Sequence, residues 1–149
     1  MKNIFRQFRG LSHSDKLRFL AIIFFVPVVK FGLKIFGFNR TADLLKKTLP
    51  PDEASEEKAA KEFARHHDLL KLFYRIYPYD GLCLPVALVF WWLLKREGVI
   101  TDLHFGMRKK GAGLSAHSWI EYKGVALEGN GDVKKRYASL EISLMSVYD

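Results

Sequence analysis

Cys83 is the residue in this chain best placed to act as a nucleophile. It is the only cysteine, and it follows a turn-rich stretch that contains Pro78, Asp80 and Gly81. Because a run of helical character begins there, the thiol is expected on the first turn of a helix, where Pro85 is also tolerated. Unpaired backbone N–H groups and a partial positive charge at a helix start stabilise a thiolate. The sequence therefore predicts an activated thiol.

His117 is the candidate base for that thiol. It lies in SAHSWIEY, a predicted strand over 115–122 in which alternation puts His117 on the same face as Trp119 and Glu121. A thiol, an imidazole and a group that orients the imidazole are the parts of a cysteine-dependent enzyme. A lone cysteine is nevertheless most often a small buried side chain, and a lone strand histidine is usually structural. The residues alone support a thiol enzyme and a non-catalytic binding domain equally.

The orienting group is expected just after a hairpin. Lys123-Gly124 predicts a two-residue turn, which sets Asn130 opposite His117 and brings Glu128 diagonally across from it on the same face. An acid and an amide would thus come within reach of the imidazole.

The hydrophobic pattern predicts the elements that position these groups. The run after Cys83 is apolar on nearly every side as far as Lys95-Arg96 and Gly98, which is typical of a central helix covered all round. The period then changes to alternation, which predicts strands over 102–109, 115–122 and 125–128. This order predicts an α+β fold, with N-terminal helices, a central apolar helix that starts near Cys83, and a small antiparallel sheet.

A further helix is predicted from the double proline at 50–51 to about Tyr77, because an acidic first turn follows the prolines. His66 and His67 are adjacent in it and must point in different directions, so we expect them at the surface or half-buried. Its apolar stripe is expected to include Ala60, Phe63, Ala64, Leu70, Phe73 and Tyr74.

The first 50 residues are interpreted as an apolar and basic helical extension of a core over 51–149, within one compact unit. Their uncharged stretch covers only 19–29, and Pro27, Lys30 and Lys34 interrupt the apolar pattern, whereas a membrane span needs about 20 apolar residues. We favour packing on the core or on a partner protein. Attachment of this segment to a membrane surface is the alternative.

Composition limits the class of protein. The chain has 149 residues, 49% of them hydrophobic, which suits one domain with extensions. A net charge of +8 suggests a nucleic acid or anionic lipid as partner, but the basic residues are scattered, and no nucleic-acid partner is expected. A single cysteine favours a reducing, cytoplasmic setting. No metal or other cofactor is expected, because the histidines lack a compact ligand spacing; they are His13, His66, His67, His104 and His117.

The motifs around Cys83 and His117 also resemble a known family. CLPVALVFWWLLKREGV followed by LSAHSWIEYKGVALEG resembles the transglutaminase-like branch of papain-type folds and, within it, the leader peptidases of lasso-peptide biosynthesis. That family has a cysteine that opens an apolar helix, an Ala-His-Ala-Trp-Val-Glu type strand, a short turn with Gly and a downstream acid. The resemblance covers about Leu82 to Leu140, and the helices from Leu17 to Lys47 are similar in character. Val86-Ala87 departs from the pattern, since many relatives carry a polar or basic pair there.

The resemblance implies a cysteine protease that removes the leader from a ribosomally made precursor peptide, so that a separate cyclase can close the ring. Cys83 would be the nucleophile and His117 the general base. The family uses an aspartate after the hairpin as the third member. Here Glu128 has the better strand register and Asp132 the matching chemistry, so they rank level, with Asn130 third.

Partners are implied as well. The family acts on a leader held by a small recognition domain, for which this chain has no room, so a separate leader-recognition protein is expected beside the precursor and the cyclase. The N-terminal region or the helix face of Trp91 and Trp92 would dock it, although we favour plain burial for the two tryptophans. A thiol acyltransferase of transglutaminase type and a non-catalytic scaffold of the maturation complex are the alternatives.

Overall fold

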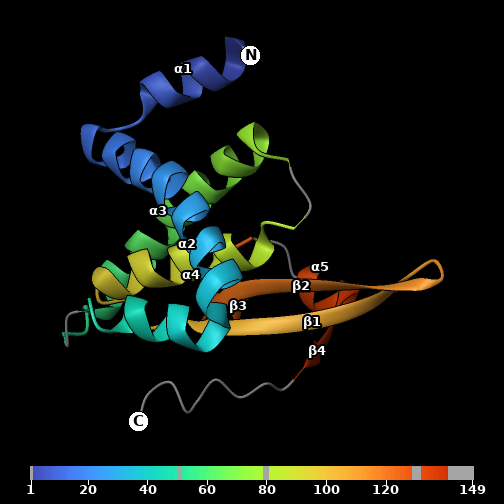
Figure 1. The fold of residues 1–149 in the computed structure, drawn as a ribbon. Coiled ribbons are helices and arrows are strands. Elements are labelled where there is room, and N and C mark those ends of the chain that lie inside the picture. The colour runs from blue at the N-terminus through green and yellow to red at the C-terminus, as the bar shows by residue number, and fades with distance from the viewer. Residues whose placement is uncertain (1, 50–51, 79–80, 129–131, 141–149) are drawn as a thin grey trace.

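The computed structural model describes residues 2–49, 52–78, 81–128 and 132–140. Helices come first and an antiparallel sheet follows, so the predicted α+β class is confirmed (Figure 1). The elements are α1 (Lys2–Gly10), α2 (His13–Lys46), α3 (Glu56–Ile76), α4 (Cys83–Arg96), β1 (Asp102–Lys110), β2 (Gly113–Tyr122), β3 (Val125–Ala126), α5 (Asp132–Arg136) and β4 (Ala138–Leu140).

The core is built around α4. Every residue from Pro85 to Trp92 is buried, as the apolar sequence predicts. The helix lies between α2 and the sheet (Figure 1). Gly98 ends it with a φ of 80°, and a Cβ there would lie 2.5 Å from the backbone nitrogen of Ala54. Only glycine suits this position, because it needs both a left-handed conformation and close contact with a neighbouring backbone.

α2 supplies one wall of the core. The Ser12 side chain caps it by accepting a hydrogen bond from the Asp15 backbone N–H, and the helix runs through Pro27 to a break at Gly37, where φ is 75°. Its inward side is buried through Phe19, Ile22, Val26 and Val29. By length and composition this helix could cross a membrane, with a mean hydropathy of 2.2 over its most apolar window.

An ion network fastens α2 to the other helices. The Arg18 guanidinium lies 3.3 Å from the Glu62 carboxylate of α3 and 2.9 Å from that of Glu97, just after α4. Asp15 adds a third carboxylate at 3.5 Å. Because Glu62 is only 7% exposed, its charge depends on Arg18 and on Arg65, whose guanidinium lies 3.2 Å from the same carboxylate.

The buried face of α3 differs from the predicted stripe. Ala60 and Ala64 are exposed, whereas Ala59 is buried. His66, expected at or near the surface, is only 1% exposed, so that prediction is wrong. Its Nδ1–H donates to the Glu62 backbone oxygen at 2.8 Å, which satisfies one ring nitrogen inside the core. The buried residues of α3 recur every three or four positions, beginning with Ala59, Glu62 and His66. The buried face of the helix therefore contains polar as well as apolar residues.

The sheet has the strand order β3-β2-β1-β4, and its pairs are antiparallel. β1 and β2 form a long hairpin that projects from the body of the molecule (Figure 1). Lys123 and Gly124 both have positive φ, as a two-residue hairpin turn requires. The predicted register after this turn is confirmed by the Tyr122–Val125 pair and by the Leu127 N–H, which donates to Ile120. β4, which pairs with the other edge of β1, was not predicted.

Candidate active site

Cys83 is the first residue of α4, as the sequence predicts. Leu82, the N-cap residue, offers no side-chain cap to the first turn. The helix start therefore presents backbone N–H groups beside the half-buried thiol. This environment favours a negative charge on the sulfur.

His117 is held by Glu128. The imidazole Nε2 lies 2.9 Å from Glu128 Oε1 and 3.1 Å from Oε2, so its N–H is shared between both carboxylate oxygens. Glu128 reaches this place because the hairpin register brings it across from β2. With Nε2 engaged, Nδ1 is the ring nitrogen that can exchange a proton with the thiol.

Cys83 and His117 form an acid–base pair. A hydrogen bond with the His117 side chain is the main cause that lowers the pKa of Cys83 to about 7; burial opposes this shift, and Ser118 adds to it. Burial by itself would lower the pKa of His117, but hydrogen bonds with Cys83 and Glu128, together with their charges, raise it to about 10. Between these two values the pair is a thiolate and an imidazolium. That is the reactive form of a catalytic cysteine.

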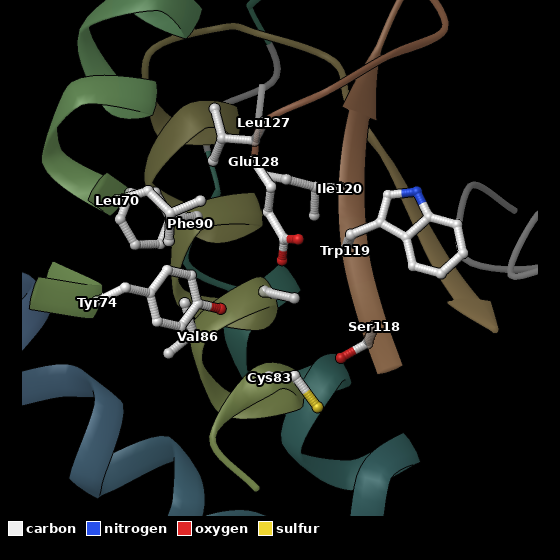
Figure 2. A pocket seen from close by; sticks show the side chains of 11 residues that line it. Leu70, Tyr74, Cys83, Val86, Phe90, Ser118, Trp119, Ile120, Leu127 and Glu128 are labelled. Atoms are coloured by element: carbon white, nitrogen blue, oxygen red, sulfur yellow. The ribbon is translucent and has the colours of Figure 1, made fainter. Parts of the chain in front are cut away.

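Two further side chains line the inner wall of the site. In Figure 2 the Ser118 hydroxyl points toward the Cys83 side chain, while the Tyr74 hydroxyl and the Glu128 carboxylate point into the same space. Ser118 Oγ is buried and has no hydrogen bond to another side chain or to the backbone among the described residues, which leaves it available to the sulfur. The pKa of Tyr74 is raised, first by burial and then by the charges of Glu128 and Cys83, so its hydroxyl remains a donor.

Neither residue was singled out from the sequence. Strand alternation does put Ser118 on the face away from His117, which is the face that packs on α4. The apolar stripe of α3 does include Tyr74. No spacing rule connects either of them to Cys83, because α3 meets the site only in the folded chain.

Aromatic rings hold the outer face of His117. The Tyr137 ring stacks on the imidazole at a centroid distance of 5.0 Å, and Trp119 follows on the same face of β2. Gly106 on β1 makes room for both side chains, since a Cβ there would lie 2.7 Å from Tyr137 Cβ and 2.8 Å from the Trp119 ring. The Trp119 Nε1–H donates to Glu121 at 2.8 Å, which fixes the indole.

A cleft of about 500 Å³ opens beside the thiol. Residues of both strand faces, such as Ser115 and Ala116, line it, so it follows the outer half of β2 toward the hairpin tip. This volume suits a short segment of extended peptide. The lining consists of Tyr74, Pro78, Gly81, Cys83, Arg108, Lys110, Leu114, Ser115, Ala116, His117, Glu128 and Tyr137.

Of the predicted site residues, the structure brings together Cys83, His117 and Glu128. Asp132 is the first residue of α5, and its side chain is outside the described part of the chain; Asn130 lies outside the described residues altogether. The divergent pair Val86-Ala87 is buried in α4. Within the described ranges, no group of three or more potential ligands could hold a metal ion.

The predicted docking surface on α4 is not available. Trp91 is 5% exposed and Trp92 is 7% exposed. The Trp92 Nε1–H donates to Thr48 at 2.8 Å, which fixes this ring against the segment after α2. Burial, the favoured interpretation, therefore explains both tryptophans.

Comparison with known proteins agrees with this geometry. A family model described as transglutaminase-like superfamily matches residues 25–141. The chain belongs to the transglutaminase-like superfamily. Domains of this superfamily are typically cysteine-dependent enzymes, with proteases and acyltransferases among them. No curated protein and no solved structure matches the chain.

Proposed function

We propose that this protein is a cysteine peptidase that removes the leader from a ribosomally made precursor peptide of the lasso type. The observation that carries the proposal is the contact of Cys83 with His117, which Glu128 holds, at the wall of a peptide-sized cleft. Membership of a superfamily that contains proteases supports hydrolysis. The choice of a lasso precursor rests on the motif resemblance around Cys83 and His117.

Acylation is the first half of the proposed reaction. The Cys83 thiolate attacks the carbonyl carbon at the leader–core junction, a C–S bond forms, and the carbonyl electron pair moves to oxygen. The Cys83 backbone N–H at the start of α4 stabilises this oxyanion. As the oxyanion collapses, the C–N bond breaks and the His117 imidazolium gives its proton to the leaving amine. The leader is left as a thioester on Cys83.

Deacylation restores the pair. Neutral His117 takes a proton from water, the resulting hydroxide attacks the thioester carbon, and the C–S bond breaks to release the thiolate and a carboxylic acid. Glu128 keeps the ring in one orientation and stabilises its charged form in both halves. A separate leader-recognition protein and a cyclase would complete the system.

Mass spectrometry of a candidate precursor peptide tests this proposal. The peptide is incubated with the protein and its leader-recognition partner, with wild type compared to Cys83→Ala. One defined cut by wild type alone is expected. An amide formed with an added amine would instead indicate the acyltransferase, and maturation that survives Cys83→Ala would indicate a scaffold.

A further inference from the structure

The outward face of α2 is an exposed apolar stripe. Its residues recur every three or four positions, so they lie along one side of the helix. Phe24 is 66% exposed and Phe31 is 64% exposed, and the stripe extends over about 27 Å at the usual rise of 1.5 Å per residue. Its members are Leu17, Leu20, Phe24, Val28, Phe31 and Ile35. A contiguous apolar face of this length marks a contact surface.

The opposite side of α2 is packed against the protein core, so its separation from the core would cost free energy. Phe19, Ile22 and Val26 are buried in the core. Arg18 also neutralises the buried Glu62 of α3. Insertion of α2 across a bilayer would break this ion pair and uncover the core. The apolar stripe is therefore presented along the surface of a folded domain, which is the geometry of an interfacial helix.

Charge indicates what this stripe meets. Residues 1–42 contain eight basic residues and one acidic residue, Asp15, so they carry a net +7 of the +8 on the whole chain. Asp15 is already paired with Arg18 and Arg65. Lys30 and Lys34, one turn apart on the flank of the stripe, are exposed. An apolar face bordered by lysines suits anionic lipid, because the rings enter the headgroup boundary while the ammonium groups stay at the phosphates.

We propose that the outward face of α2 binds the surface of an anionic lipid bilayer with the helix axis parallel to the membrane plane. Phe24 and Phe31 enter the interface, and Lys30 and Lys34 contact lipid phosphates. This contact is independent of the peptidase proposal, since none of these residues lines the cleft that holds Cys83.

Co-sedimentation of the full chain with vesicles tests the proposal. Vesicles of phosphatidylcholine with phosphatidylglycerol are compared with vesicles of phosphatidylcholine alone, at low and high salt. Wild type is expected to bind the anionic vesicles, and to bind more weakly without phosphatidylglycerol or at high salt. Absence of binding to the anionic vesicles overturns the proposal.

Matched variants locate the contact. Lys30→Glu/Lys34→Glu is expected to weaken binding at least about tenfold, because each substitution replaces an attraction to the anionic surface with a repulsion. Lys58→Glu/Lys61→Glu changes the net charge equally on the exposed side of α3 and should leave binding near wild type. Equal losses of vesicle binding in the two double variants would show that only the net charge of the protein matters, and would contradict the proposal.

The contribution of the apolar stripe to vesicle binding is tested by Phe24→Asp/Phe31→Asp. Val125→Asp is the control at another exposed apolar position. Loss of vesicle binding only in the α2 variant supports the proposal. Circular dichroism must show that each variant remains folded, and Phe24→Ser/Phe31→Ser replaces the aspartate pair if it does not. If wild type self-associates without lipid, fails to bind vesicles, and becomes monomeric in the α2 variant, the stripe joins protein chains and the lipid proposal is wrong.

Discussion

At the scale of single residues, the reactivity of Cys83 depends on the groups that share its proton. His117 lowers the thiol pKa by a hydrogen bond, and Glu128 keeps the imidazole charged and oriented. The side chain and the backbone of Ser118 lower the thiol pKa further. The thiolate is therefore maintained by a side-chain network in addition to the start of α4.

Two separate substitutions distinguish whether Glu128 or Asp132 orients His117. Glu128→Gln removes the charge that supports the imidazolium, so peptidase kcat/KM should fall by about 10²-fold or more. Asp132→Asn should stay close to wild type. Both values are measured by rates of precursor cleavage. The opposite order of effects would assign the orienting role to Asp132.

The sequence was sufficient for part of this site. Cys83 and His117 could be found because a helix start and a strand histidine each leave a local signal, and the hairpin turn at Lys123-Gly124 brought Glu128 into register. Tyr137 could not be found in the same way. It reaches His117 only because α5 and β4 fold back onto the sheet, and this long-range contact leaves no periodic pattern.

At the scale of the elements, the β1–β2 ladder is shaped by the contact of Gly106 with aromatic rings. Gly106→Ala should destabilise the protein by about 1–3 kcal/mol, because the new methyl group overlaps Trp119 and Tyr137. Gly113→Ala in the same hairpin is the control, since the nearest atom to its Cβ would be 3.9 Å away. Urea unfolding measures both. Equal stability of the two variants would mean that the rings have room to move.

The buried histidine of α3 predicts a pH dependence of stability. Burial is the main cause that lowers the pKa of His66 below its ordinary 6.5. The unfolded chain therefore binds a proton at His66 more readily than the folded chain does. The stability that comes with a neutral, buried His66 is fully present above pH 6.5, and it is lost as the pH falls from 6.5 through the folded pKa. Measured by urea unfolding, the free energy of unfolding should fall less steeply from neutral to acidic pH in His66→Leu than in wild type. Parallel curves would show that His66 does not titrate in this way.

Elements were predicted more reliably than their buried faces. The start of α4 and the hairpin register followed from local signals, namely Pro85 and Lys123-Gly124. The stripe of α3 did not, since Glu62 and His66 are buried through partners that a hydrophobic pattern ignores. The short β4 strand was missed because its pairing partner, β1, lies about 30 residues earlier in the chain.

At the scale of the whole molecule, Arg18 joins three helices through its carboxylate partners. Arg18→Met should cost about 1–3 kcal/mol of stability, because it removes one of the two guanidinium groups that pair with the buried Glu62 and leaves only Arg65, at 3.2 Å. Addition of Glu62→Gln should recover part of that loss, which a double-mutant cycle by urea unfolding would reveal. Simple additivity of the two losses would show that the pair is not coupled.

The central claim is that His117 holds Cys83 as a thiolate, and an ultraviolet titration of the thiolate tests it most directly. Cys83 is the only cysteine, so subtraction of the Cys83→Ala titration isolates its thiolate from the absorbance of the six tyrosines. Wild type should titrate near pH 7. His117→Ala should titrate at clearly higher pH, because the largest cause of the lowered pKa is gone, and Ser118→Ala should show a smaller upward shift. A midpoint near the ordinary value of 9 in wild type, unchanged by His117→Ala, would contradict the account.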